Sequence, residues 1–503
     1  MTRKQKIFIN TASNIGLQFI NMAIRFILMP LVLAYFGKEV FGINAYIGSI
    51  VLIFNFFGFA ISMSLMKYIP EMIGKNEYKQ INKLIFSVLP ISVFLYFILG
   101  LLIFTFPLYG LNWFNVPENL QTLTKSVMQL IGIFTCLQFL QPIAGGILSG
   151  FQHFHLHNKI MIISVISSIL AYIIVKKTNT DLFYYVLISQ IGMFIVLIIK
   201  VYYCIKVIPF KIKFVKPDFK TLKRVFGFNL YLISNQVADH FMYTTDRLIL
   251  QKVLGPVSVT YYHVGRRISD LVRQFTTLPT SALIPECSKA FATNDDNFLT
   301  KLNITGQLLY NFLIIPASIV FILLLDKFIV LWVGPDFKTS ILIGRLFLLN
   351  ILISTVYRFF IVNLISNNKV KEIGISKFVY CIINMIVSYI LAKKIGILGV
   401  IIPTVFYFYV IYPSILFYLL KKLKYYTIKE FLSVTLPSIL TITITIILFY
   451  FGSNYLKVDS WISFIRKFTV FYLISSVIYL LFTKDSERKN IFHLIRSIKI
   501  FRI

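Results

Sequence analysis

The sequence predicts an all-α polytopic membrane protein with about 14 transmembrane helices. Of its 503 residues, 58% are hydrophobic and only 14% are charged, and the mean hydropathy is +0.81. Apolar runs of roughly 20 residues recur along the whole chain, and each is long enough to cross a bilayer as a helix. These runs are too long and too continuously apolar for the alternating strands of a membrane barrel, which have about 10 residues each.

The predicted spans are separated by short linkers, which leave no room for a sizeable soluble domain. The first run is too long for the apolar part of a signal peptide, so we expect it to remain in the membrane. In chain order, the spans are centred near residues 22, 51, 95, 137, 168, 192, 240, 270, 317, 353, 382, 407, 441 and 472.

The basic residues are expected to lie mainly on the cytoplasmic side of the membrane. The formal net charge is +31. With the N-terminus in the cytoplasm, about 31 Lys and Arg fall on that side against about 10 on the other. The largest cluster runs from Lys200 to Arg224. The positive-inside rule thus explains the charge without nucleic acid as a partner, and it predicts a multi-pass protein of the cytoplasmic membrane with both termini inside.

A basic linker divides the chain into two similar halves. Shifting the sequence by 218 positions places Gln18 on Gln236 and Gly37 on Gly255. Repeats of this kind are typical of transporters, whose substrate path lies between the two repeats. The predicted domains are an N-terminal lobe (1–205, helices 1–6), a cytoplasmic amphipathic linker (206–224), a C-terminal lobe (225–424, helices 7–12), helices 13 and 14 (425–483) and a basic cytoplasmic tail (484–503).

A polar stripe runs along the first predicted span. Asn14, Gln18, Asn21 and Arg25 are spaced by four, three and four residues, so they share one face of a helix. A charged group in hydrocarbon costs about 3 kcal/mol or more. The stripe is therefore expected to face water or a polar partner.

Three later spans carry similar stripes. The polar residues of the seventh, eighth and tenth spans are Asn235, Asp239, Asp246 and Arg247, then Arg266, Arg267, Asp270 and Arg273, then Arg345 and Arg358. As a purely structural alternative, Asp239 or Asp246 could pair with an arginine of the eighth span and hold the two helices together. Across these stripes, however, the arginines outnumber the aspartates. The surplus predicts a water-filled cationic cavity for an anionic substrate, since guanidinium binds phosphate and carboxylate with two hydrogen bonds.

Two stretches of the sequence also resemble a known family. "DRLILQKVLGPVSVTYYHVGRR", within residues 243–291, is similar to the seventh and eighth helices of polysaccharide-biosynthesis flippases. "GGILSGFQHFHLHNKI" (145–160) resembles the turn between their fourth and fifth helices. The family belongs to the multidrug/oligosaccharidyl-lipid/polysaccharide exporter superfamily. The resemblance implies two six-helix lobes in a V around a central cavity, with the last two helices outside the repeat.

The resemblance also implies a function. It suggests a flippase that moves polyprenyl-pyrophosphate-linked oligosaccharide from the inner to the outer leaflet by alternating access, as in O-antigen and lipopolysaccharide biosynthesis. Arg25 and the helix-eight arginines would hold the pyrophosphate, while Asp239 and Asp246 would re-pair between states. The expected partners are this lipid-linked substrate, membrane lipids, a polysaccharide polymerase and glycosyltransferases.

Two alternatives stay open. An ion-coupled multidrug exporter of the same superfamily should have an acidic cavity for cationic drugs. A membrane polymerase or glycosyltransferase should need catalytic residues in large outer loops, and these loops are short.

No enzymatic activity, cofactor or metal is expected. The alternating histidines His153, His155 and His157 are interpreted as a polar turn, because no carboxylate or cysteine lies near them in the sequence. The four cysteines show no CxxC spacing, and no GxxxxGK[ST] motif is present for ATP binding.

Overall fold

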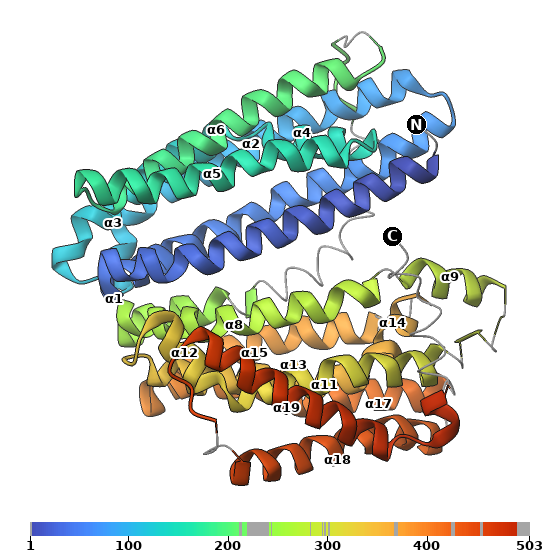
Figure 1. Cartoon of the computed structure of the whole chain (residues 1–503). Helices are drawn as coiled ribbons and strands as arrows, with labels where there is room; N and C mark the ends of the chain where they lie inside the picture. Colours follow the sequence, from blue (N-terminus) through green and yellow to red (C-terminus); the bar gives the residue numbers. More distant parts are fainter. Residues whose placement is uncertain are drawn as a thin grey trace. The chain divides into compact units, whose positions relative to one another are not determined.

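The computed structural model is all-helical in the residues that it describes (Figure 1). Within that part, ten helices are long and apolar enough to cross a membrane, or eleven if one bent pair counts as a single span. Outside the description lie residues 1–2, 211–213, 219–240, 243, 282, 294, 296–297, 300–301, 367–370, 424–427, 453–455 and 490–503, and the side chains of 3–15, 54–57, 278–281, 284–286, 292, 371–373, 420–423 and 428–430.

The chain forms two compact units. The first comprises Met1–Thr260 with Tyr389–Ile397, and the second comprises Tyr261–Ser388 with Leu398–Ile503. The helices of the first half are α1 (Arg3–Gly74), α2 (Tyr78–Trp113), α3 (Glu118–Leu137), α4 (Gln141–Gly150), α5 (Phe154–Thr178) and α6 (Leu182–Val207).

The helices of the second half carry most of the second unit. They are α8 (Pro256–Ser281), α9 (Ile284–Ala292), η1 (Leu302–Gly306), α11 (Gln307–Leu323), α12 (Leu325–Val333), α13 (Lys338–Val356), α14 (Arg358–Ser366), α15 (Lys371–Ile395), α16 (Ile397–Phe406), η2 (Tyr407–Ile411), α17 (Tyr412–Leu423), α18 (Ile428–Gly452) and α19 (Trp461–Phe482). All the predicted span centres fall in these helices or in those of the first half, except the centre near residue 240, which lies outside the described residues.

Helix α1 contains the first two predicted spans. It breaks at Gly37, whose φ of 78° lies in the left-handed region that favours glycine. Figure 1 shows that α1 turns back on itself. Helix α8 is not among the candidate spans, because its charged residues make it less apolar than the helices that are.

Backbone geometry supports the internal repeat. Gly37 and Gly255, which the 218-residue shift superposes, both have positive φ, at 78° and 80°. The next two turns at the same end of the helices also match: Asn115 with Gly334, and Asn179 with Gly396, all with positive φ. The break between α3 and α4 recurs between α13 and α14 at nearly the same offset.

At each of the two helix breaks, a polar side chain of an earlier helix forms hydrogen bonds with backbone groups. Helices α3 and α4 bend by 46°, and Ser92 Oγ donates to the Phe139 carbonyl at 2.6 Å. In the second half, Gln307 Nε2 donates to the Thr355 carbonyl at 2.9 Å, and its Oε1 accepts from the Phe359 N–H at 2.7 Å. Such compensation is required because hydrocarbon offers no water to unpaired peptide groups.

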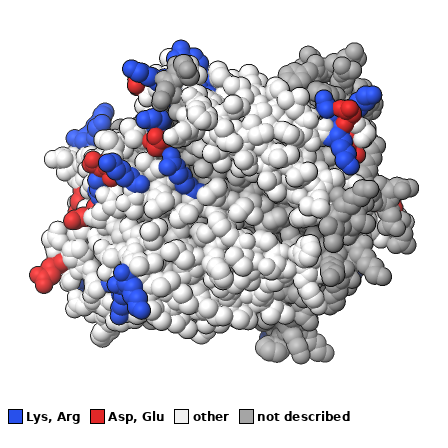
Figure 2. Space-filling view, turned by 90° about the horizontal axis from the view of Figure 1, so that it is seen from below, with Lys and Arg blue, Asp and Glu red and all other residues white. Residues whose placement is uncertain are grey.

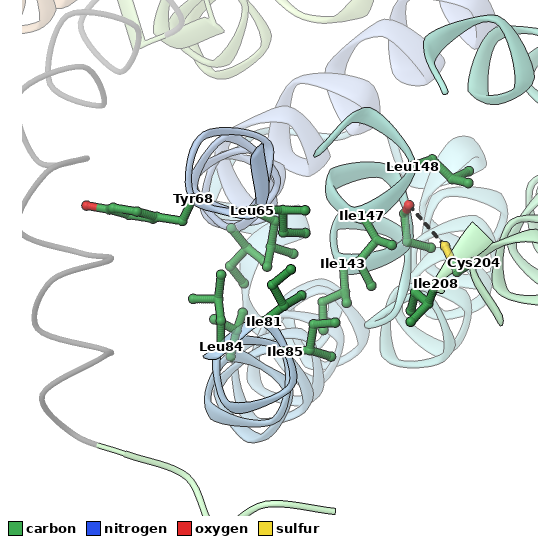
Figure 3. Packing of buried hydrophobic residues seen from close by; sticks show 14 of the residues in the cluster. Leu65, Tyr68, Ile81, Leu84, Ile85, Ile143, Ile147, Leu148, Cys204 and Ile208 are labelled. Carbon is green, nitrogen blue, oxygen red and sulfur yellow. Dashed lines mark hydrogen bonds between the residues drawn. The ribbon is translucent and has the colours of Figure 1, made fainter. Parts of the chain in front are cut away.

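The core of the first unit packs α1, α2, α4 and α6 around apolar side chains (Figure 3). A Cβ added at Gly146 would lie 2.8 Å from Leu65 Cβ, so α1 and α4 approach closely through a small residue. Cys204 Sγ donates to the Ala144 carbonyl at 3.3 Å and fixes α6 against α4.

The last two helices are joined to α11 by buried polar contacts. Asn311 Nδ2 donates to Ser438 Oγ of α18 at 3.2 Å. Tyr479 of α19 donates its hydroxyl proton to the Leu308 carbonyl at 3.2 Å. Thr445 and Ser475 hydroxyls, 2.8 Å apart, join α18 to α19. On the face shown in Figure 2, most charged side chains lie toward the left and the right of the view, with a broad uncharged area between them, as expected for a membrane protein.

Candidate functional site

The charged stripe of α8 forms one connected group in the second unit. Asp270 Oδ1 lies 3.2 Å from Arg266 Nη2 and 3.3 Å from Arg273 Nη2. The exposed fractions of these side chains rise along the helix, from 11% at Arg266 to 28% at Asp270 and 47% at Arg273. One carboxylate therefore serves two guanidinium groups, and this trio, the α8 triad, keeps a formal charge of +1.

Close helix packing positions the inner arginine. A Cβ at Gly265 would lie 2.6 Å from the Ser340 carbonyl oxygen, so only glycine lets α8 approach α13 this closely. Ser340 Oγ also donates to the Tyr261 carbonyl at 2.9 Å. At this crossing the Arg266 guanidinium lies over the Phe347 ring, 4.6 Å from its centroid. Stacking on one side and Asp270 on the other hold Arg266 in place.

Polar contacts continue from the triad toward Arg358. Thr277 Oγ1 donates to the Arg273 carbonyl at 3.0 Å, one turn along α8. Tyr310 of α11 donates its hydroxyl proton to the Thr276 carbonyl at 2.6 Å. Arg358, at the start of α14, lies near enough to Tyr310 to interact with it electrostatically. The second unit thus places Arg358 and the triad along one polar path.

The stripe on α1 belongs to the first unit. Arg25 and Gln18 are exposed on a helix that is apolar enough to span the membrane. Asn21 Nδ2 donates to the Leu17 carbonyl of its own helix at 3.0 Å. Arg25 also interacts electrostatically with Tyr185 of α6. The side chain of Asn14 lies outside the described residues.

The seventh predicted span is described only in part. Asn235 and Asp239 lie outside the described residues, so the exchange of partners expected of Asp239 remains a prediction. Asp246 is fully buried, and Arg247 beside it is half-buried. In α8, Arg267 is also half-buried.

Arg345 lies away from the triad. Its Nη2 is 3.6 Å from Asp326 Oδ1, and its Nε donates to the Ile322 carbonyl at 3.4 Å. It therefore faces the junction of α11 and α12, whereas Phe347, two residues on, faces α8. The sequence grouped Arg345 with Arg358 by spacing, but α13 ends at Val356 and a new helix begins at Arg358.

A buried lysine in the first unit, Lys200, was counted from the sequence with the basic cluster of a cytoplasmic loop. Lys200 lies within α6, is only 4% exposed, and donates to Gln141 Oε1 at 2.9 Å. Gln141 in turn donates to the Met193 carbonyl at 3.2 Å. The unbroken apolar run on both sides of Lys200 was the signal that it belongs to a helix rather than to a loop.

Only His153 lies in the turn between α4 and α5, whereas His155 and His157 lie in the first turn of α5. The interpretation of all three histidines as a polar turn is therefore wrong for two of them. The rings of His153 and His155 have centroids 5.7 Å apart. Among the residues that the structure describes, no three His, Cys, Asp or Glu side chains are grouped so that they could hold a metal ion.

The family can now be assigned from the sequence comparison. A family model described as "Polysaccharide biosynthesis protein" matches residues 7–291, more than half of the chain. The chain belongs to the polysaccharide biosynthesis protein family. No curated protein sequence gives a significant match.

Solved structures show which fold this family member has. A lipid II flippase, MurJ, in an inward closed conformation superposes with a TM-score of 0.68 at 19% identity, covering 97% of this chain and 99% of that one. A multidrug resistance MATE family transporter of the MOP superfamily, inward-facing, gives a TM-score of 0.63 at 12% identity, covering 80% of this chain and 92% of that one. The protein is an all-helical polytopic membrane protein with a MurJ- and MATE-like fold.

Proposed function

We propose that the protein is a flippase for polyprenyl-pyrophosphate-linked oligosaccharide, which it moves from the inner to the outer leaflet of the cytoplasmic membrane by alternating access. The observation that carries this proposal is the α8 triad, in which two arginines share one carboxylate on a helix of the membrane bundle. The proposal is supported by the family assignment and by the fold shared with the lipid II flippase.

The chemistry of the triad suits a pyrophosphate. Two guanidinium groups offer paired N–H donors, and the net positive charge compensates the hydration that the phosphates lose in a membrane. The Arg273–Asp270 contact is half-exposed, and pairs of this kind contribute only about 0–1 kcal/mol. An incoming phosphate can therefore displace the carboxylate at little cost. In this proposal Arg25, which is exposed on α1, faces the same substrate path.

The proposal is tested by transport of a fluorescent polyprenyl-pyrophosphate glycan in liposomes that contain the purified protein. Arg273→Gln should slow translocation by at least about tenfold, because a hydrogen bond to a charged group contributes about 1.5–3 kcal/mol. Arg466→Gln, which removes an exposed arginine of α19, is the matched control and should leave the rate unchanged. Full transport by a correctly folded Arg273→Gln protein would overturn the proposal.

A multidrug exporter is the second candidate, because the MATE transporter shares the fold. A positively charged triad disfavours organic cations as cargo, since like charges repel. Uptake of a fluorescent organic cation by the same liposomes, without glycan transport, would favour this candidate instead.

A further inference from the structure

A pocket separate from the α8 triad lies in the second unit, where the last two helices meet the repeat. Its volume is about 650 Å³. It lies at the end of α11 and the start of α12, beside the connection between α18 and α19. The lining residues are Leu323, Leu324, Asp326, Lys327, Arg345, Phe449, Leu456, Lys457, Val458, Asp459 and Lys467.

The charged lining of this pocket is predominantly basic. Four of the lining residues are Lys or Arg and two are Asp, which gives a formal surplus of two positive charges. Asp326 is shared, since its carboxylate oxygens lie 3.6 Å from Arg345 Nη2 and 3.7 Å from Lys327 Nζ. Both distances exceed the 2.7–2.9 Å or so of a strong charge-assisted hydrogen bond. Arg345 and Lys327 thus retain donor capacity for a ligand.

One of the four cations is buried. Lys467 is only 5% exposed, and its ammonium donates to the Leu456 carbonyl at 2.9 Å. The same ammonium lies 5.4 Å from the centroid of the Phe449 ring. Keeping a lysine charged inside a membrane protein is costly unless an anion or several dipoles face it. Lys467 therefore adds a buried amine, held by the Leu456 carbonyl, to the lining of the pocket.

We propose that this pocket binds a phosphate-ester anion. Arg345 supplies a guanidinium that can form two hydrogen bonds to phosphate, and the lysines supply point charges around it. The leucines, valine and phenylalanine of the lining suit the apolar start of a lipid chain. The phosphate can come from an anionic phospholipid headgroup or from a polyprenyl pyrophosphate. The proposal does not depend on the transport function, because the pocket can bind an anionic lipid whatever the cargo is.

Binding can be measured by native mass spectrometry of the full-length protein in neutral detergent. Three probes are titrated separately: phosphatidylglycerol, polyprenyl pyrophosphate and zwitterionic phosphatidylcholine. We expect the wild-type protein to retain at least one of the anionic lipids and not phosphatidylcholine. Selective retention of the first probe assigns the site to a membrane phospholipid, and selective retention of the second assigns it to a pyrophosphate lipid.

Substitutions locate the binding in the pocket. The double variant Arg345→Gln with Lys457→Gln should bind about tenfold more weakly, since two charged donors are lost. Lys467→Met should act in the same direction with little change in side-chain volume. Asp459→Asn should strengthen binding, because it removes one of the two negative charges. Lys338→Gln, an exposed lysine at the start of α13 that does not line the pocket, is the control.

Two results would overturn the proposal. One is equal retention of all three lipids by the wild-type protein. The other is unchanged affinity in the Arg345→Gln, Lys457→Gln protein, in which Lys457 is exposed and the Arg345 side chain is 42% exposed, so the substitutions should not prevent folding.

Discussion

Asp270 is the central residue of the candidate site, because it contacts both of the arginines. It accepts from Arg266 and Arg273 at almost equal distances, 3.2 and 3.3 Å. The two arginines differ in surroundings, because Arg266 is nearly buried over Phe347 while Arg273 is half-exposed. Under the proposed function, Asp270 would compete with an anionic substrate mainly for the exposed Arg273, and this competition would limit affinity and favour release.

Removing this competitor should strengthen binding and slow transport. Asp270→Asn should bind polyprenyl pyrophosphate up to about fivefold more tightly, because an exposed ion pair contributes up to about 1 kcal/mol. The measurement is the dissociation constant for a fluorescent lipid pyrophosphate, together with the translocation rate in liposomes. Asp485→Asn, which removes an exposed carboxylate after α19, should change neither quantity. Weaker binding by Asp270→Asn would show that the carboxylate orients the arginines rather than competing for them.

At the scale of elements, the two broken helices depend on side chains that replace missing backbone partners. Gln307 spans the break between α13 and α14 by pairing with Thr355 and Phe359. Ser92 has the corresponding role beside the break between α3 and α4. Pro142 near the start of α4 is a sequence signal for the first break, whereas no proline marks the second. The second break was therefore not predictable from a proline, and both helix pairs were predicted as single spans.

Loss of the Gln307 side-chain amide should destabilise the second unit. Gln307→Leu leaves two buried backbone groups without their partner, at a cost of about 2 kcal/mol or more. The expected result is a lower unfolding temperature of the purified protein in detergent. Gln80→Leu, at an exposed position of α2, is the control and should unfold near the wild-type temperature. Equal unfolding temperatures for both variants would contradict the assigned role of Gln307.

The left-handed turns supply a second prediction at this scale. Gly255 has a φ of 80°, so Gly255→Ala should cost about 1–2 kcal/mol through steric strain. Gly374 lies inside α15 with open space around its Cβ position. Gly374→Ala should therefore stabilise the protein by about 0.5–1 kcal/mol. Unfolding temperatures that move in the same direction for the two variants would be inconsistent with this geometry.

The whole molecule combines a repeated backbone with an unrepeated charge pattern. The turns at Gly37 and Gly255 match, as do the broken helices of the two halves. Under the same shift, however, Arg266, Asp270 and Arg273 correspond to Gly48, Leu52 and Asn55. The turns and helix breaks thus repeat in both halves, whereas the charged stripe of α8 has no counterpart at the matching positions of α1.

The membrane orientation is a prediction for the whole molecule. The positive-inside distribution puts the N-terminus in the cytoplasm. A membrane-impermeant thiol reagent should then label Lys177→Cys and Lys338→Cys in intact cells, because both positions are exposed next to the outer turns. Lys79→Cys and Lys484→Cys should react only after the cells are opened. The four native cysteines are replaced by serine in the reference protein. The reverse labelling pattern would show the opposite orientation.

The sequence alone predicted the helical class and the position of the repeat, because both depend on regular spacing of apolar residues and on one glycine turn. It did not predict which face of α13 Arg345 occupies, since spacing cannot tell which neighbour a face meets. It also placed Lys200 in a loop, because charge was weighed above the apolar residues around it. Burial and partners of single polar side chains follow from packing, which the pattern does not contain.

The hydrogen bonds from α11 to the last two helices have a mechanical consequence. Asn311 donates a hydrogen bond to α18, and the Leu308 carbonyl accepts one from the Tyr479 hydroxyl of α19; both hydrogen bonds are buried. Separating these helices would leave several polar groups in hydrocarbon without hydrogen-bond partners. We therefore expect α18 and α19 to move with α11 as a single rigid body. A spectroscopic probe on the outer surface of α18 or α19 would then report every displacement of α11.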